Sequence, residues 1–336
     1  MFPSLSEFRI CHFPRRMAAL TQSPLRPDFP VLIELELTRH TNLELSGTRK
    51  KRPPVIDLSK EAAISYLRQM AALSSVGVHF GGRGEVSLHG DASELIKAAR
   101  EMQLEVGVET NGLHLPKPLL ESIVRFSNVC VVKVDAPKAK DYAAMYGVAV
   151  EDWHSVMENC VALANYRNGK RARVKLAARL LINDFTVRSV QGWAEDMQSI
   201  GFDAIHILCP QSHLHNLLKL PLLALDSETF RIEIDTFPSS IAYSGPCYCM
   251  AFLAFISSDR LVYACRKRIE KDSPLGTLEE HLLSTIILSE ERRRLLKTAS
   301  VEDCQDCPAL KLNKFISQVL ESNGLWKHFI LEPWKL

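Results

Sequence analysis

The chain has 336 residues, which is long enough for two domains or for one large domain with an appendage. Hydrophobic residues make up 46% of it and charged residues 24%; these proportions are typical of a globular protein and exclude disordered and collagen-like chains. The net charge of +2 makes neither nucleic acid nor an anionic membrane an expected partner. No apolar run is long enough to span a bilayer.

The first residues and the cysteines together indicate a cellular compartment. No apolar core follows a basic start behind Met1, so we expect no secretory signal. Met17 follows two arginines and is an alternative start. The chain has nine cysteines, an odd number, and without a signal peptide they are typical of reduced thiols in a cytoplasmic protein.

Short β-like runs alternate with amphipathic helical stretches from residue 31 onward. Prolines keep residues 1–29 irregular. The strand candidates are residues 31–37, 76–80, 104–110, 128–135, 173–182 and 203–208. The helical stretches between them cover about residues 58–73, 90–103, 116–126, 150–166 and 187–200. Six βα units over residues 30–210 need parallel strands and right-handed crossovers, so we expect an α/β fold that is either an open doubly wound sheet or a partial barrel.

The rhythm of strands and helices stops after Pro210. We expect a linker over residues 211–244, followed by a cysteine-bearing region and a C-terminal tail over residues 245–336. Five of the nine cysteines lie in this last region, and two of them form a CxxC pattern. Such a group of cysteines is a candidate metal site, whereas scattered cysteines are usually small buried hydrophobic residues.

The strand candidates are apolar on one parity and polar on the other. Strand side chains alternate between faces, so the apolar set is expected to meet outer helices and the polar set to line a lumen. Because charges are not buried unpaired and dry, we favour a hydrated, ligand-sized cavity; the alternative is an internal lattice of salt bridges or frayed strand ends. The polar set is Glu34, Glu36, His79, Glu105, Glu109, Lys133, Asp135, Arg173, Lys175, Arg179 and His206.

Three segments resemble, in order and spacing, motifs of the radical SAM superfamily, whose members bind S-adenosylmethionine (SAM). Residues 37–48 read LTRHTNLELSGT and are similar to the loop that holds the family's iron–sulfur cluster. Residues 81–112 begin GGRGEVSLHG and end in TNG, and residues 131–147 read VVKVDAPKAKDYAAMYG. The resemblance implies a partial (β/α)6 TIM-like barrel.

The cluster loop departs from the family pattern. Its three cysteine positions fall on Thr41, Leu45 and Thr48. In the family, three thiolates hold three irons of a [4Fe–4S] cluster and SAM chelates the fourth. A leucine cannot bind iron, and a threonine hydroxyl is neither anionic nor soft. His40 and Glu44, which flank these positions, do not replace three thiolates. The resemblance therefore implies the fold without the reductive cleavage of SAM.

Other positions of the family's SAM site are kept in part. The resemblance makes the following residues candidates for cofactor binding: Gly82, Gly84, Glu85, Asn111, Asp135 and Arg179. Glu85 matches the acidic residue that binds the SAM ammonium in the family; the alternative is an ordinary carboxylate at the barrel rim. Val86 and Lys133 depart from the family's proline and serine, so SAM binding, if retained, is expected to be weakened.

The C-terminal cysteines resemble the shortened SPASM domain, called twitch, that follows many radical SAM barrels. Cys249 and Cys265 bracket a hairpin-like run, and Cys304 and Cys307 form the CxxC pattern. Gly276, Thr277 and Leu278 match the family's helix entry. The resemblance implies one auxiliary [4Fe–4S] cluster or a tetrahedral zinc on these four thiolates, and spacing alone does not choose between them. Four unligated thiols are the alternative.

Three functions remain open. The first is a radical-SAM-like pseudoenzyme that binds a peptide, a metabolite or an active radical SAM partner without making radicals. The second is an active enzyme that uses SAM or an anionic ligand in the cavity for other chemistry, with the candidate groups His79, Glu85, Lys133, Asp135 and Arg179. The third is an assembly subunit that docks through the aromatic residues Phe315, Trp326, Phe329 and Trp334 together with Ile330.

Overall fold

The structure is a computed structural model that describes residues 30–44, 54–73, 75–184, 186–237, 243–269, 273–301, 304, 307 and 310–321. One sheet runs through these residues in the order β10-β9-β8-β1-β2-β3-β4-β5-β6-β7. Its strands are β1 (Leu32–Leu35), β2 (Gly77–Phe80), β3 (Glu105–Thr110), β4 (Val129–Asp135), β5 (Lys175–Leu181), β6 (Ala204–Pro210), β7 (Arg231–Phe237), β8 (Leu253–Ile256), β9 (Leu261–Tyr263) and β10 (Gly276–Thr277).

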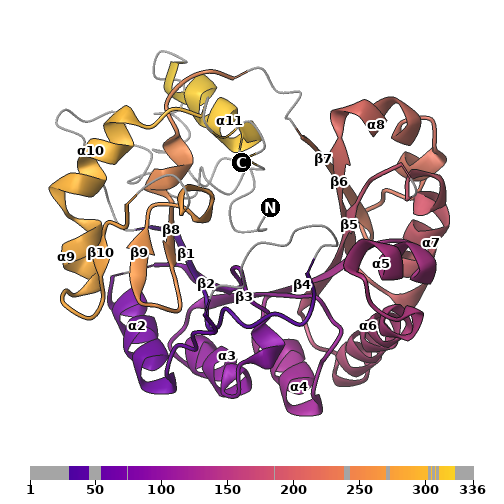
Figure 1. The fold of residues 1–336 in the computed structure, drawn as a ribbon, viewed down its shortest axis with the longest axis horizontal. Helices are drawn as coiled ribbons and strands as arrows, with labels where there is room; N and C mark the ends of the chain where they lie inside the picture. Colours follow the sequence, from indigo (N-terminus) through magenta and orange to yellow (C-terminus); the bar gives the residue numbers. More distant parts are fainter. Residues whose placement is uncertain are drawn as a thin grey trace, which may run out of the picture.

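The sheet curves into an open barrel with helices on its outer face (Figure 1). Strands β1 to β7 are parallel, and β7 and β10 form the two edges. The helices are α2 (Lys60–Ala72), α3 (Ala92–Glu101), α4 (Lys117–Phe126), α5 (Ala139–Tyr146), α6 (Val150–Lys170), α7 (Val190–Ile200), α8 (Gln211–Leu217), α9 (Leu283–Ile287), α10 (Glu290–Thr298) and α11 (Leu310–Glu321). This architecture confirms the expected partial α/β barrel.

The core lies between the strands and the outer helices. Val78 and Phe80 of β2 are fully buried and belong to one hydrophobic cluster with Leu67 of α2 and Ile96 of α3. The same parity is buried along the other barrel strands, which confirms the apolar face expected from the sequence. Local signals set the helix boundaries: Ser59 caps the start of α2, for example.

The segment from 211 to 244 differs from the expected linker. It contains α8 and then β7, which pairs in parallel with β6 over seven residues. Ile232 and Ile234 alternate with polar residues here, but the preceding leucine-rich stretch obscures the period of two. The short helix η5 (Pro221–Ala224) occupies that stretch. The sheet therefore continues beyond β6, the last strand that the six βα units predict, with the parallel strand β7.

The cysteine-bearing hairpin continues the barrel sheet. Strand β8 pairs in parallel with β1, and β9 and β10 follow it in antiparallel pairing. The expected hairpin between Cys249 and Cys265 is therefore present, and it lies directly beside the first barrel strand (Figure 1). Within the described ranges, no helix is long and apolar enough to cross a membrane. Residues 1–29 and the aromatic tail beyond residue 321 lie outside the described residues.

Candidate functional site in the barrel lumen

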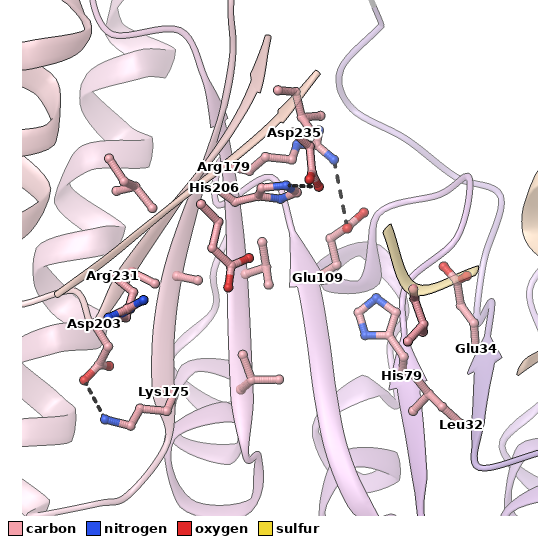
Figure 2. A pocket seen from close by; sticks show the side chains of 18 of the residues that line it. Leu32, Glu34, His79, Glu109, Lys175, Arg179, Asp203, His206, Arg231 and Asp235 are labelled. Atoms are coloured by element: carbon pink, nitrogen blue, oxygen red, sulfur yellow. Dashed lines mark hydrogen bonds and ion pairs between the residues drawn. The ribbon is translucent and has the colours of Figure 1, made fainter. Parts of the chain in front are cut away.

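The barrel lumen contains a cavity of about 720 Å³. Polar side chains from β1, β2, β3, β5, β6 and β7 line it, and apolar residues such as Leu181 and Leu208 complete its wall. Figure 2 shows Glu34 and His79 on one side of this cavity and Arg179, His206 and Asp235 on the other, with Glu109 between them in an ion pair with Arg179. Of the eleven polar residues expected to line a lumen, six line this cavity: Glu34, His79, Glu109, Lys175, Arg179 and His206. The other five are not part of its wall: Glu36, Glu105, Lys133, Asp135 and Arg173.

The same polar face also forms a lattice of ion pairs. The Arg179 guanidinium donates to both carboxylate oxygens of Asp135, from Nε at 3.0 Å and from Nη2 at 2.9 Å. Lys133 lies 3.2 Å from Glu109. Arg266, from the segment after β9, lies 2.8 Å from Glu34. The two alternatives drawn from the sequence, a cavity and a lattice, therefore coexist in the lumen.

Burial sets the charge state of the lumen groups. It lowers the pKa of His79 to about 3, so this imidazole is neutral at physiological pH. Burial also raises the pKa of Glu34 to about 7, although the Arg266 charge opposes the shift. Burial alone would raise the pKa of Glu109 as well, but the charges of Lys133 and Arg266 outweigh it and hold that pKa well below its ordinary value.

Glu85 lies on the other side of the wall, in a fully internal hydrogen-bond network. Its side chain is buried, with 1% of the residue exposed. One carboxylate oxygen accepts from the Thr110 hydroxyl at 2.5 Å and from the Ser87 amide at 3.2 Å, and the other accepts from the Asn111 amide at 2.7 Å. The carboxylate thus holds the turn after β3 to the short helix η3 (Val86–Leu88). It is not the ordinary rim carboxylate of the alternative interpretation.

Two other candidate ligand residues are engaged in the same way. The Asn111 side-chain amide donates to the side chain of Asn42 at 2.6 Å. Asp135 accepts from the Tyr146 hydroxyl at 2.7 Å in addition to its two bonds from Arg179. Among the six residues predicted from the resemblance, Arg179 lines the cavity. Binding of SAM by all six residues stays a prediction.

The glycines of the loop after β2 allow close packing. Gly82 has a φ of +126°, a region that favours glycine. A Cβ atom on Gly84 would lie 2.0 Å from the carbonyl oxygen of Thr38. The neighbouring Glu85 amide donates to the carbonyl of His40 at 2.8 Å. These glycines therefore let the loop pack on residues 38–40, at the start of the segment that resembles the family's cluster loop.

We expect Gly84→Ala to destabilise the chain by about 1–3 kcal/mol, because the new methyl group overlaps a backbone oxygen that cannot move freely. Gly90→Ala is the matched control, since a Cβ there meets nothing within 4 Å. Urea unfolding of the two variants measures the difference in their free energies of unfolding. Equal midpoints for Gly84→Ala and Gly90→Ala would contradict this packing role.

The residues that replace the cluster ligands offer no thiolate. The Thr41 hydroxyl donates to the carbonyl of Leu43 at 2.9 Å, and it accepts from the amide of the same residue at 3.3 Å. Leu45 and Thr48 lie outside the described residues. A hydroxyl engaged in a local turn, with a leucine and a second threonine in the other two positions, does not fit a [4Fe–4S] cluster.

The C-terminal cysteines come together at one end of the lumen. Cys265 and Cys307 line the cavity, and Cys249 is buried in the short helix η6 (Tyr248–Ala251). Burial raises the pKa of Cys265 to about 12. It raises that of Cys249 well above its ordinary value, and the charges of Cys247, Cys307 and Cys265 add to the shift. The thiols therefore lie near enough to influence one another.

Among the described residues, the cysteines form no disulfide. In the described parts of the chain, no three cysteine, histidine or carboxylate side chains lie close enough to share one metal ion. Binding of a metal would require these protonated thiols to lose their protons. The metal site on Cys249, Cys265, Cys304 and Cys307 stays a prediction.

Asp235 was missed by the sequence analysis, because it lies in the expected linker. It is on β7, and its Oδ2 atom lies 2.8 Å from Nε2 of His206 on β6. Both residues line the cavity. The alternation of polar and apolar residues over 231–237 is the signal that could have placed this carboxylate on a strand.

Comparison with known proteins identifies the fold. No family model matches the chain, and no curated protein matches its sequence. The crystal structure of Streptococcus suis SuiB bound to the precursor peptide SuiA is similar, with a TM-score of 0.67 and 13% identity over 87% of this chain and 72% of that one. The structure of SuiB bound to S-adenosylmethionine is similar with a TM-score of 0.66 and 13% identity over 87% of this chain and 71% of that one.

A second enzyme gives the same result. Histidine-tagged anSMEcpe with bound AdoMet is similar with a TM-score of 0.60 and 15% identity over 85% of each chain. SuiB and anSMEcpe are radical SAM enzymes. At these identities the likeness concerns the fold, and the chain has the partial barrel fold of radical SAM enzymes.

Proposed function

We propose that this chain is a radical-SAM-like protein that has lost SAM cleavage and binds a ligand in its lumen. The observation that carries the proposal is the set of residues at the cluster positions. Thr41 is engaged in a local turn, and Leu45 and Thr48 contribute no thiolate. Without three thiolates there is no cluster to donate the electron for reductive cleavage.

The state of the candidate SAM ligands supports the same proposal. Glu85 and Asp135 would have to give up internal hydrogen bonds before they could bind a SAM ammonium or ribose. Breaking such buried bonds costs about 1–3 kcal/mol for each group left unsatisfied. A SAM site built on these residues is therefore weakened relative to one whose carboxylates are free.

Among the ligands considered, we favour a peptide over a metabolite or an active partner enzyme. One similar structure is SuiB bound to its precursor peptide, and another is anSMEcpe with AdoMet and the Cp18Cys peptide. The lumen of this chain has a cavity of about 720 Å³, room for a few side chains. We also propose a reducing compartment such as the cytoplasm, because the cysteines in the described part of the chain form no disulfide.

The C-terminal cysteines are the proposed site of one auxiliary [4Fe–4S] cluster or of zinc. When bound, the metal would cross-link the hairpin to the segment that contains the CxxC pattern. Cys249 and Cys265 come from the two ends of the hairpin, and Cys304 and Cys307 from the segment before α11. Thiolates are the donors that both metal centres need.

Anaerobic reconstitution with iron and sulfide tests both parts of the proposal. We expect one cluster per chain, its loss in a Cys304→Ser/Cys307→Ser variant, and no 5′-deoxyadenosine from SAM under reducing conditions. Cys160→Ser, at a buried cysteine of α6, is the matched control and should keep the cluster. Two clusters together with SAM cleavage would contradict the loss of function; no cluster at all would contradict only the auxiliary site.

A further inference from the structure

The pair His206–Asp235 is the one hydrogen-bonded histidine–carboxylate pair that lines the lumen cavity in the described part of the chain. The two side chains are mostly buried, with 15% and 17% of their surfaces exposed. A carboxylate only accepts, so Nε2 of His206 donates a hydrogen bond to Asp235, and in this tautomer the lone pair of the imidazole is on Nδ1. No described residue forms a hydrogen bond with Nδ1. A ligand in the cavity can therefore meet an imidazole that Asp235 orients.

Arg179 lies beside this imidazole on the neighbouring strand. Strands β5 and β6 pair with Arg179 opposite His206, so both side chains project from the same face of the sheet. Its Nε and Nη2 atoms are held by Asp135, whereas Nη1 is 4.0 Å from Glu109, too far for a hydrogen bond. The Nη1 atom therefore remains a cationic hydrogen-bond donor for a ligand oxygen.

Small residues leave room next to these two groups. Ala177 and Ala204 face each other across β5 and β6, two residues before Arg179 and His206, and both line the cavity. Leu181 and Leu208 line it on the other side of the same two residues. A base, a cationic donor and an apolar wall thus surround one space, the combination that binds and polarises a carbonyl group.

We propose that His206 is a general base, oriented by Asp235, for a small ester or similar activated acyl compound whose carbonyl oxygen Arg179 binds. Nδ1 of His206 takes a proton from water while the water oxygen forms a bond to the acyl carbon. The π electron pair of the C=O bond moves to the oxygen beside Arg179. This electron pair then re-forms the C=O bond as the bond to the leaving group breaks, and the imidazolium gives its proton to the leaving group.

Water is the only co-reactant of this hydrolysis. The inference does not rest on the loss of SAM cleavage, because none of its groups belongs to the cluster loop. His206 is the catalytic residue, since it contacts the reacting water. Asp235 is a positioning residue, because it acts through the imidazole.

Hydrolysis of p-nitrophenyl acetate by the full chain tests the proposal. The native chain is expected to be at least about 10²-fold faster than the urea-unfolded chain, which has the same imidazoles without the pair. The rate of the His206→Gln variant is expected to fall to that of the unfolded chain. His213→Gln is the matched control: His213, on α8, lies 3.4 Å from Asp184, is 16% exposed and does not line the cavity. This variant should keep the native rate.

Two further measurements separate positioning from structure. Asp235→Asn should lose about 10²-fold in rate with an unchanged unfolding midpoint, and Asp235→Glu should restore part of the loss. The native rate should be slower in heavy water, because a proton moves in the rate-limiting step. The proposal is overturned if the native chain hydrolyses the ester no faster than the unfolded chain, or if folded His206→Gln keeps full activity. Ester hydrolysis without SAM cleavage is compatible with the proposed loss of radical chemistry, so the two proposals are tested separately.

Discussion

Replacing Glu36 by glutamine is expected to lower the free energy of unfolding by about 3 kcal/mol or more, the largest effect among these predictions. The Glu36 side chain is fully buried and accepts from Arg83 through Nη2 at 2.8 Å, through Nε at 2.9 Å and through its backbone amide at 2.9 Å. The Ser258 hydroxyl, from the C-terminal hairpin, donates to it at 3.2 Å. Glutamine has the same shape but lacks the charge and one acceptor oxygen.

Urea unfolding at neutral pH measures this change. Glu101→Gln is the control, because Glu101 is an exposed residue whose pair with Lys97, at 3.6 Å, is worth less than about 1 kcal/mol. If Glu36→Gln lowers the free energy of unfolding no more than Glu101→Gln does, the Glu36 carboxylate does not hold the loop after β2 to the C-terminal hairpin.

The Glu36 effect should also depend on pH. Burial alone would raise the pKa of this carboxyl, but the hydrogen bonds from Arg83 outweigh it and hold the pKa below its ordinary value. A carboxyl with a lowered pKa contributes stability that is fully present above its unfolded value and is lost as pH falls through the folded value. The stability gap between the native chain and Glu36→Gln should therefore narrow in acid. A constant gap down to acid unfolding would contradict this coupling.

Replacing Glu85 by alanine is expected to destabilise the chain by about 3 kcal/mol, because it leaves two buried donors without an acceptor at about 1–3 kcal/mol each. These donors are the Thr110 hydroxyl and the Asn111 amide. If Glu85 were only a ligand for SAM, the same substitution would weaken SAM binding and leave stability unchanged. Thermal unfolding in the absence of any ligand separates the two outcomes.

A double-mutant cycle with Thr110→Val sharpens the Glu85 test. Both single changes remove the same 2.5 Å hydrogen bond, so their effects should be less than additive, with a coupling of about 0.5–3 kcal/mol. Glu94→Ala, at an exposed position of α3, supplies the control for loss of a surface carboxylate. Additive effects of Glu85→Ala and Thr110→Val would exclude the shared bond.

Alternation along single strands was enough to predict part of the cavity lining. In β2, Val78 and Phe80 belong to the outer core, whereas His79 between them lines the cavity. That pattern is local, because side chains of a strand point alternately to its two faces. The partial barrel followed from the repeated βα units together with the family motifs.

What the sequence left open depends on pairing between distant segments. Asp235 joins His206 only because β7 extends the sheet beyond β6, and no local pattern near residue 206 indicates such a neighbour. Glu85 matched a ligand position in the motif, yet the fold turns its carboxylate toward Thr110 and Asn111. Motif spacing identifies a residue type at a position, whereas its hydrogen-bond partners are set by tertiary structure.

The pairing of β8 with β1 has a consequence for biosynthesis. Leu32 of β1 pairs with Leu253, 221 positions later. At about 5–20 residues per second, a ribosome needs roughly 10–40 seconds to deliver that partner, and until then one edge of β1 has unpaired backbone amides and carbonyls. Exposed strand edges recruit other chains. The nascent barrel therefore has an open edge that can pair with other chains until its last hairpin has been translated.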